Sequence, residues 1–162
     1  MDEHSTLTRR AWLGSFGRTL TAGLVLTAAR SDDALATSAA KLTVYRDPSC
    51  GCCTKWVAHL RASGFTPDVQ DRGDMGALKD TLGVPVALRS CHTAVAGKYI
   101  VEGHVPATDI KRLLSSRPKD VIGIAVPDMP AGSPGMEMGG RSDHFDVIAF
   151  GSTGTTRIFG RH

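Results

Sequence analysis

The chain has 162 residues, in which 19 Lys and Arg stand against 16 Asp and Glu, so its formal net charge is only +3. A charge this small gives no reason to expect nucleic acid or an anionic membrane surface as a partner. The length fits one domain with its own hydrophobic core after an N-terminal segment is set aside.

The N-terminal segment has the pattern of an export signal. Arg9 and Arg10 are paired, a modestly apolar stretch covers 19–29, and small residues at 34–36 form a cleavage-site pattern. Paired arginines are typical of a twin-arginine signal. Arg18 interrupts the apolar region, which is shorter than the roughly 20 residues of a membrane span. A plain N-terminal arm is the alternative. The prediction is a periplasmic protein with no membrane anchor after cleavage, in which 1–36 is a twin-arginine-type signal peptide, 37–41 a short linker and 42–162 the folded domain.

Strands and helices are predicted to alternate in the first half of this domain. Residues 42–45 alternate and carry β-branched and aromatic side chains, which predicts a strand. Apolar residues at helical spacing predict a helix over 54–63 that ends before Gly64. A second strand over 65–71 and a short helix over 75–82 follow.

The second half begins with a predicted hairpin formed by 93–96 and 99–102. Pro106 suits the first residue of a further helix. The element order β-α-β-α-β-β-α predicts an α/β, thioredoxin-like fold. In that layout a C-x-x-C motif is expected after the first strand, and the C-G-C-C of this chain departs from it.

A Pro-, Gly- and Met-rich segment over 126–140 is predicted to be a loop, because Pro and Gly disfavour both a helix and a central strand. Residues 145–150 and 155–159 then predict a C-terminal β-hairpin. The loop carries Met129, Met136 and Met138. These methionines are either apolar filling or thioether ligands, and the sequence leaves both open.

Clustered cysteines are the main functional signal. Cys50, Cys52 and Cys53 lie on one turn at the start of the predicted 54–63 helix, and Cys91 is followed directly by His92. The partial positive charge of a helix N-terminus stabilises thiolates, which are soft ligands for Cu(I), Zn and iron in iron–sulfur clusters. Two structural disulfides are the alternative, with three pairings available. His92 and His104 are weaker candidate ligands, each more often a hydrogen-bonded structural histidine.

Four segments together resemble the CopG-like family of exported bacterial metal-binding proteins, formerly a domain of unknown function and associated with copper resistance. They are 44–53 (V-Y-R-D-P-S-C-G-C-C), 90–94 (S-C-H-T-A), 102–107 (E-G-H-V-P-A) and 126–137 (V-P-D-M-P-A-G-S-P-G-M-E). Four motifs in one order are more specific than any one alone. The resemblance covers roughly 42–159. It implies a thioredoxin-like fold with copper bound at Cys50, Cys52, Cys53 and Cys91, and leaves open whether His92, His104 and Met136 ligate.

Three functions are compatible with these residues. The first is an exported copper-binding protein that holds several Cu(I) ions in a thiolate cluster and contributes to copper resistance or homeostasis. The second is a thiol–disulfide or copper-linked oxidoreductase, in which one cysteine attacks and a neighbour resolves. A structural zinc module is the third and least favoured, because zinc usually takes separated ligand pairs and the C-G-C-C spacing does not suit that arrangement. Expected partners are copper ions, with other periplasmic copper-handling or redox proteins as candidates.

Overall fold

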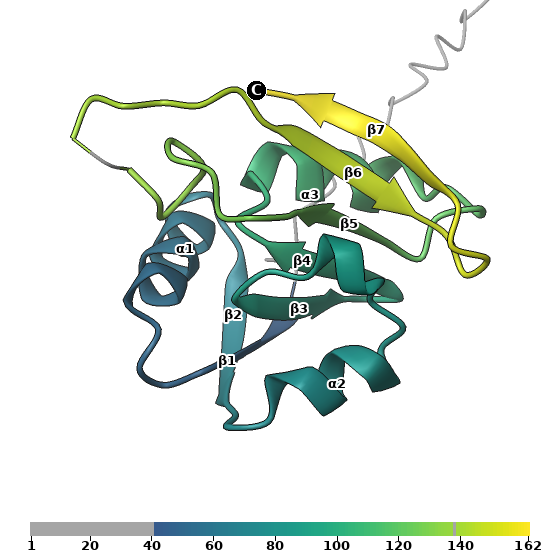
Figure 1. Ribbon diagram of the computed structural model, residues 1–162, viewed down its shortest axis with the longest axis horizontal. Coiled ribbons are helices and arrows are strands. Elements are labelled where there is room, and N and C mark those ends of the chain that lie inside the picture. The colour runs from purple at the N-terminus through teal and green to yellow at the C-terminus, as the bar shows by residue number, and fades with distance from the viewer. Residues whose placement is uncertain (1–40, 138) are drawn as a thin grey trace, which may run out of the picture. The chain divides into compact units, whose positions relative to one another are not determined.

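A computed structural model describes residues 41–137 and 139–162 (Figure 1). The predicted signal peptide, four of the five residues of the predicted linker and Met138 lie outside the described residues. Within 41–162, apart from residue 138, no helix is both long enough and apolar enough to cross a membrane.

The described residues form one mixed sheet of seven strands with the order β2-β1-β3-β4-β5-β6-β7. Strand pairs β1–β2 and β4–β5 are parallel, and the remaining neighbours are antiparallel. The strands are β1 (Lys41–Arg46), β2 (Thr66–Asp71), β3 (His92–Ala96), β4 (Tyr99–Gly103), β5 (Gly123–Val126), β6 (Asp146–Phe150) and β7 (Thr156–Arg161). The helices are α1 (Gly51–Ala62), α2 (Met75–Thr81) and α3 (Ala107–Ser116), with a 3₁₀ turn, η1, at Val86–Leu88.

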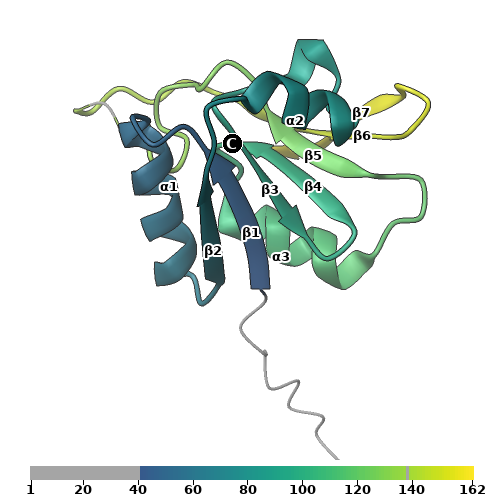
Figure 2. The ribbon, with the colours of Figure 1, turned by 90° about the horizontal axis from the view of Figure 1, so that it is seen from below.

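Helices cover both faces of the sheet (Figure 2). Helices α1 and α3 pack on one face, where Trp56, Leu60 and Ile110 join the larger buried cluster. The segment from α2 to η1 covers the other face, where Val84 and Leu88 contact a smaller cluster. Alternate residues of a strand point to opposite faces, so β4, β5 and β6 each contribute to both clusters.

The predicted order of the first seven elements is the observed order, and the C-terminal hairpin is confirmed as β6–β7. Strand β5 was not predicted. Its Gly-Ile-Ala-Val sequence is buried on both faces and lies between β4 and β6, so it shows no alternation of polar and apolar residues. A run this short, without alternation, is hard to recognise from periodicity.

The strand directions bring four loops together at one end of the central strands. In the antiparallel β1–β3 pair, Arg46 at the end of β1 is opposite His92 at the start of β3. In the β3–β4 pair, Thr93 is opposite Glu102 near the end of β4, and β5 runs parallel to β4. The loops that follow β1, β4 and β5 therefore lie near the loop that precedes β3.

Candidate metal centre

The C-G-C-C motif forms the start of α1. Asp47 stabilises the turn before the helix, because its Oδ1 accepts the Ser49 N–H at 2.8 Å and its carbonyl accepts the Cys50 N–H at 3.1 Å. Cys50 is the N-cap, and its Sγ accepts the backbone N–H of Cys53 at 3.4 Å. The helix thus begins three residues earlier than predicted, which places Cys52 and Cys53 in its first turn, where the macrodipole favours negative charge.

Cys50 and Cys53 form a disulfide with an S–S distance of 2.05 Å. The first and fourth residues of C-G-C-C are therefore themselves a C-x-x-C pair, with Cys52 as one of the two inner residues. The expectation that the motif departs from C-x-x-C is wrong in this respect. Cys52 and Cys91 carry free thiols, so the alternative of two disulfides is not the observed state.

The fourth cysteine lies beside the motif, as expected from the strand order. The Cys52 Sγ is 3.4 Å from the Cys50 Sγ and 3.9 Å from the Cys91 Sγ. The four sulfurs all lie within 4.8 Å of one another. Cys53 is fully buried, and the other three are half-buried, so the cluster is partly open to solvent.

Cys91 also belongs to a second group of donor atoms, with His92 and His104. Its Sγ lies 3.2 Å from the Nδ1 of His92 and 3.1 Å from the Nε2 of His104. The Nδ1 of His104 lies 2.8 Å from the Pro134 carbonyl, which only accepts, so this nitrogen donates. In the neutral ring, Nε2 of His104 then carries the lone pair that faces Cys91. A backbone carbonyl that fixes a histidine tautomer in this way is typical of metal-ligating histidines.

Both imidazoles are poised to be neutral. Burial lowers the pKa of His104, and burial together with the neighbouring His104 and Lys79 lowers the pKa of His92 well below its usual value. The His92 ring is fully buried, packs 4.3 Å from the Trp56 ring, and its Nε2 has no hydrogen-bond partner among the described residues. A neutral imidazole has a free lone pair, which is the form that binds metal.

The Cys91 sulfur is held as a thiol. Burial, and then the adjacent Cys52, raise its pKa to about 12. A metal that binds this sulfur must therefore displace a proton, since only the thiolate ligates well.

The loop after β5 covers one side of the site. Gly135 lies against the backbone of α1, so closely that a Cβ there would be 2.9 Å from the Cys52 carbonyl oxygen and 3.3 Å from the His104 Nδ1. Met136, the next residue, is half-buried, and Met129 is 39% exposed. The loop thus places Met136, a candidate thioether ligand, directly after the glycine that lies against α1 and His104.

Comparison with known proteins identifies the family of the chain. Two solved structures, both titled "Copper resistance protein copG" (Form 2 and Form 1), are 44% and 45% identical to this chain, with TM-scores of 0.72 and 0.71. Each match covers 75% of this chain, and 97% and 96% of the matched chains. The chain belongs to the CopG copper resistance protein family. A family model described as a protein of unknown function, DUF411, matches residues 88–136, and no curated protein matches.

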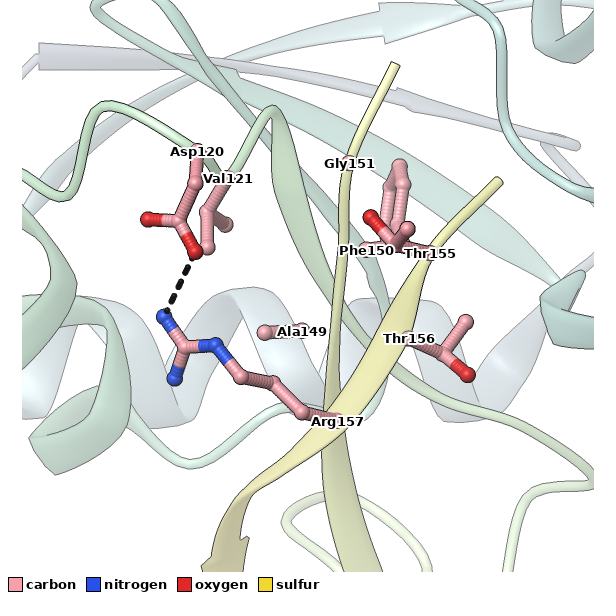
Figure 3. A pocket seen from close by; sticks show the side chains of 8 residues that line it. All are labelled: Asp120, Val121, Ala149, Phe150, Gly151, Thr155, Thr156 and Arg157. Atoms are coloured by element: carbon pink, nitrogen blue, oxygen red, sulfur yellow. Dashed lines mark ion pairs between the residues drawn. The ribbon is translucent and has the colours of Figure 1, made fainter. Parts of the chain in front are cut away.

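The DUF411 match within this CopG-family chain includes Cys91, His104 and the loop after β5 as far as Met136, but not the C-G-C-C motif. A separate pocket of about 260 Å³ has Asp120 and Val121 from within this match and its other lining residues from the C-terminal hairpin, and Asp120 and Arg157 form an ion pair of 3.5 Å there (Figure 3). Its lining includes Val121, before β5, and Phe150, at the end of β6. The pocket therefore lies at the ends of the strands opposite those that carry the cysteines, and none of the predicted ligands line it.

A buried ion pair lies behind the site, on the α2 face of the sheet. Lys79 is 4% exposed and Glu102 is 0% exposed, and the Lys79 Nζ lies 2.5 Å from the Glu102 Oε1. No role was predicted for either residue. A lysine in a short helix is usually solvated, and Glu102 is 23 positions away in the sequence, so no local pattern indicates that the two residues pair.

Proposed function

We propose that this protein binds Cu(I) at Cys50, Cys52, Cys53 and Cys91 and thereby contributes to copper resistance. The observation that carries the proposal is the convergence of four sulfurs within 4.8 Å in a member of the CopG family. Thiolates are soft ligands that favour Cu(I), and such close sulfurs suit bridging between more than one ion. His92, His104 and Met136 are secondary donors in this proposal.

Full use of the four sulfurs requires the Cys50–Cys53 disulfide to be reduced. An external dithiol can do this by thiol–disulfide exchange: it supplies two electrons and two protons, becomes a disulfide itself and leaves two thiols at Cys50 and Cys53, and metal binding then releases thiol protons. In the reduced state the helix N-terminus offsets part of the negative charge that the thiolates of the C-G-C-C turn bring together.

A second candidate function is thiol–disulfide or copper-linked oxidation and reduction. The specific observation in its favour is that Cys50 and Cys53 are paired at a helix N-terminus, the position where a C-x-x-C cysteine has a lowered pKa and can exchange disulfides. The order β2-β1-β3-β4, with β3 antiparallel to its neighbours, supports a thioredoxin-type core. The periplasm is the proposed compartment, based on the N-terminal signal pattern.

Anaerobic titration of the reduced protein tests the first function. Free thiols and bound copper are counted on the same sample, with Zn(II) as competitor. We expect more than one Cu(I) per chain, preference over Zn(II), and a marked loss of binding in Cys91→Ser, because a hydroxyl is a hard, neutral ligand of similar size. A single tightly held zinc would overturn the proposal. Rapid disulfide reduction of an insulin-type substrate by the metal-free protein would favour the oxidoreductase.

A further inference from the structure

The buried carboxylate of Glu102 is shared by three donors. Its Oε1 accepts the Lys79 ammonium at 2.5 Å and the backbone N–H of Ser90 at 2.6 Å, and its Oε2 accepts the Thr93 hydroxyl at 2.6 Å. The Lys79 Nζ also donates to the Thr93 Oγ1 at 2.8 Å. These contacts join α2, β3, β4 and the loop before β3 in one buried polar network.

The Ser90 contact connects this network to the candidate metal centre. Ser90 directly precedes Cys91, and Glu102 comes two residues before His104. One carboxylate therefore ties together the two chain segments whose side chains meet at the 3.1 Å contact between the Cys91 Sγ and the His104 Nε2. The network lies on one face of the sheet, and the His92 ring packs on the other, against Trp56.

Stability alone is a poor reason for such a network. A buried ion pair loses much of its Coulombic gain to desolvation, and well-packed apolar residues are often as good or better. The same face of the sheet carries an apolar cluster that includes Val84, Leu88 and Ile100, so apolar packing is already available there. What an apolar pair cannot supply is an acceptor for the Ser90 N–H.

We propose that Glu102 is a positioning residue: its carboxylate holds the Ser90 backbone, and so sets the place of the Cys91 sulfur relative to Cys52 and His104. Lys79 and Thr93 hold the carboxylate in turn. The effect on copper rests on the proposed function, whereas the effect on the position of Cys91 does not.

Two matched double variants separate positioning from the ion pair. Lys79→Met with Glu102→Gln removes both charges but keeps a carbonyl oxygen for Ser90, and the Gln amide can donate to Thr93. Lys79→Met with Glu102→Leu removes the same charges and leaves the Ser90 N–H without its acceptor. An unsatisfied buried donor is costly, so we expect the loop to shift in the Leu variant alone.

The first readout is Cu(I) affinity of the reduced proteins, measured by competition with a Cu(I) chelator. We expect the Gln double variant to stay within about threefold of the natural protein and the Leu double variant to bind about tenfold more weakly or worse, as for one lost buried hydrogen bond. Equal affinities in the two double variants would overturn the proposal.

The second readout does not need copper. With the Cys50–Cys53 disulfide intact, iodoacetamide can modify only Cys52 and Cys91, and mass spectrometry gives the ratio of the two rates. We expect this ratio to rise in favour of Cys91 by about tenfold in the Leu variant, as its half-buried sulfur is released. If the natural protein takes up no copper, the proposed function fails while this ratio still decides the positioning role.

A third variant covers the case in which the Leu protein does not fold. Glu102→Asp keeps the charge and Lys79, but the shorter side chain withdraws the oxygens from Ser90. It should raise the Cys91 to Cys52 alkylation ratio in the same direction. An unchanged ratio in a folded Glu102→Asp protein would show that Glu102 has a structural role only.

Discussion

A substitution at Gly135 tests how the loop after β5 shapes the site. Gly135 has φ +90°, and an added Cβ would lie 2.8 Å from the Trp56 nitrogen and 2.9 Å from the Cys52 carbonyl oxygen. Both are backbone atoms of α1, which cannot rotate away as a flexible side chain can. Gly135→Ala must therefore move the loop off the helix, and with it the Pro134 carbonyl that accepts the His104 N–H at 2.8 Å.

The expected loss of stability has two parts. A left-handed backbone conformation costs an L residue about 1–2 kcal/mol. Loss of the hydrogen bond from His104 to Pro134 adds about 1 kcal/mol. We therefore expect Gly135→Ala to lower the free energy of unfolding by about 2–3 kcal/mol. The His104 ring also loses the partner that fixes its tautomer, so Cu(I) affinity should fall.

Gly140 provides a matched control. It lies in the same loop with φ +95°, and nothing lies within 4 Å of the Cβ that Ala would add. Gly140→Ala carries the same type of backbone cost without a clash, so we expect a loss of about 1–2 kcal/mol and unchanged Cu(I) affinity. Urea unfolding and chelator competition measure the two quantities. If both variants lost equal stability and both kept full affinity, the contact of Gly135 with α1 would have no part in the site.

Three other predictions concern separate features. Metal-free protein should become less stable as the pH falls below 6.5, because the His92 ring has a lowered pKa and stays neutral in the folded state but takes up a proton in the unfolded state. His92 alone should lower the free energy of unfolding by up to about 1.4 kcal/mol per pH unit. Urea unfolding between about pH 7 and pH 5.5 should show a shallower pH dependence in His92→Gln, and an identical slope would contradict this assignment. Met136→Leu keeps apolar volume and removes the sulfur, so we expect a stability change below about 1 kcal/mol with weaker Cu(I) binding, whereas unchanged binding would make Met136 a packing residue. Changing Arg9 and Arg10 both to Lys should leave precursor in the cytoplasm by cell fractionation, and normal export would remove the twin-arginine interpretation.

The elements that carry the cysteines were predictable because their signals are local and strong. The alternation of 42–45 and the helical spacing after residue 54 predict a strand, a turn and a helix, which correspond to β1 and α1. A strand order of this type then brings Cys91 to the same edge as the C-G-C-C turn. The distance of 3.9 Å between the Cys52 and Cys91 sulfurs agrees with that expectation.

The supporting contacts were not predictable, because they join backbone atoms to side chains far away in sequence. The Pro134 carbonyl reaches His104 across 30 positions, and Glu102 reaches the Ser90 N–H across 12. No periodicity or composition records a contact of this kind. The Cys50–Cys53 disulfide is a different case, because its C-x-x-C spacing is local, but four cysteines allow three pairings and the sequence alone does not choose among them.

The two donor groups explain why copper binding and thiol redox chemistry need not exclude each other. Cys91 is common to the four-sulfur group and to the group with His92 and His104. Oxidation of Cys50 and Cys53 withdraws two sulfurs from the first group and leaves every atom of the second. The disulfide would then lower the number of thiolate ligands in the site. The neutral imidazoles, which also bind Cu(II), would remain beside the Cys91 sulfur.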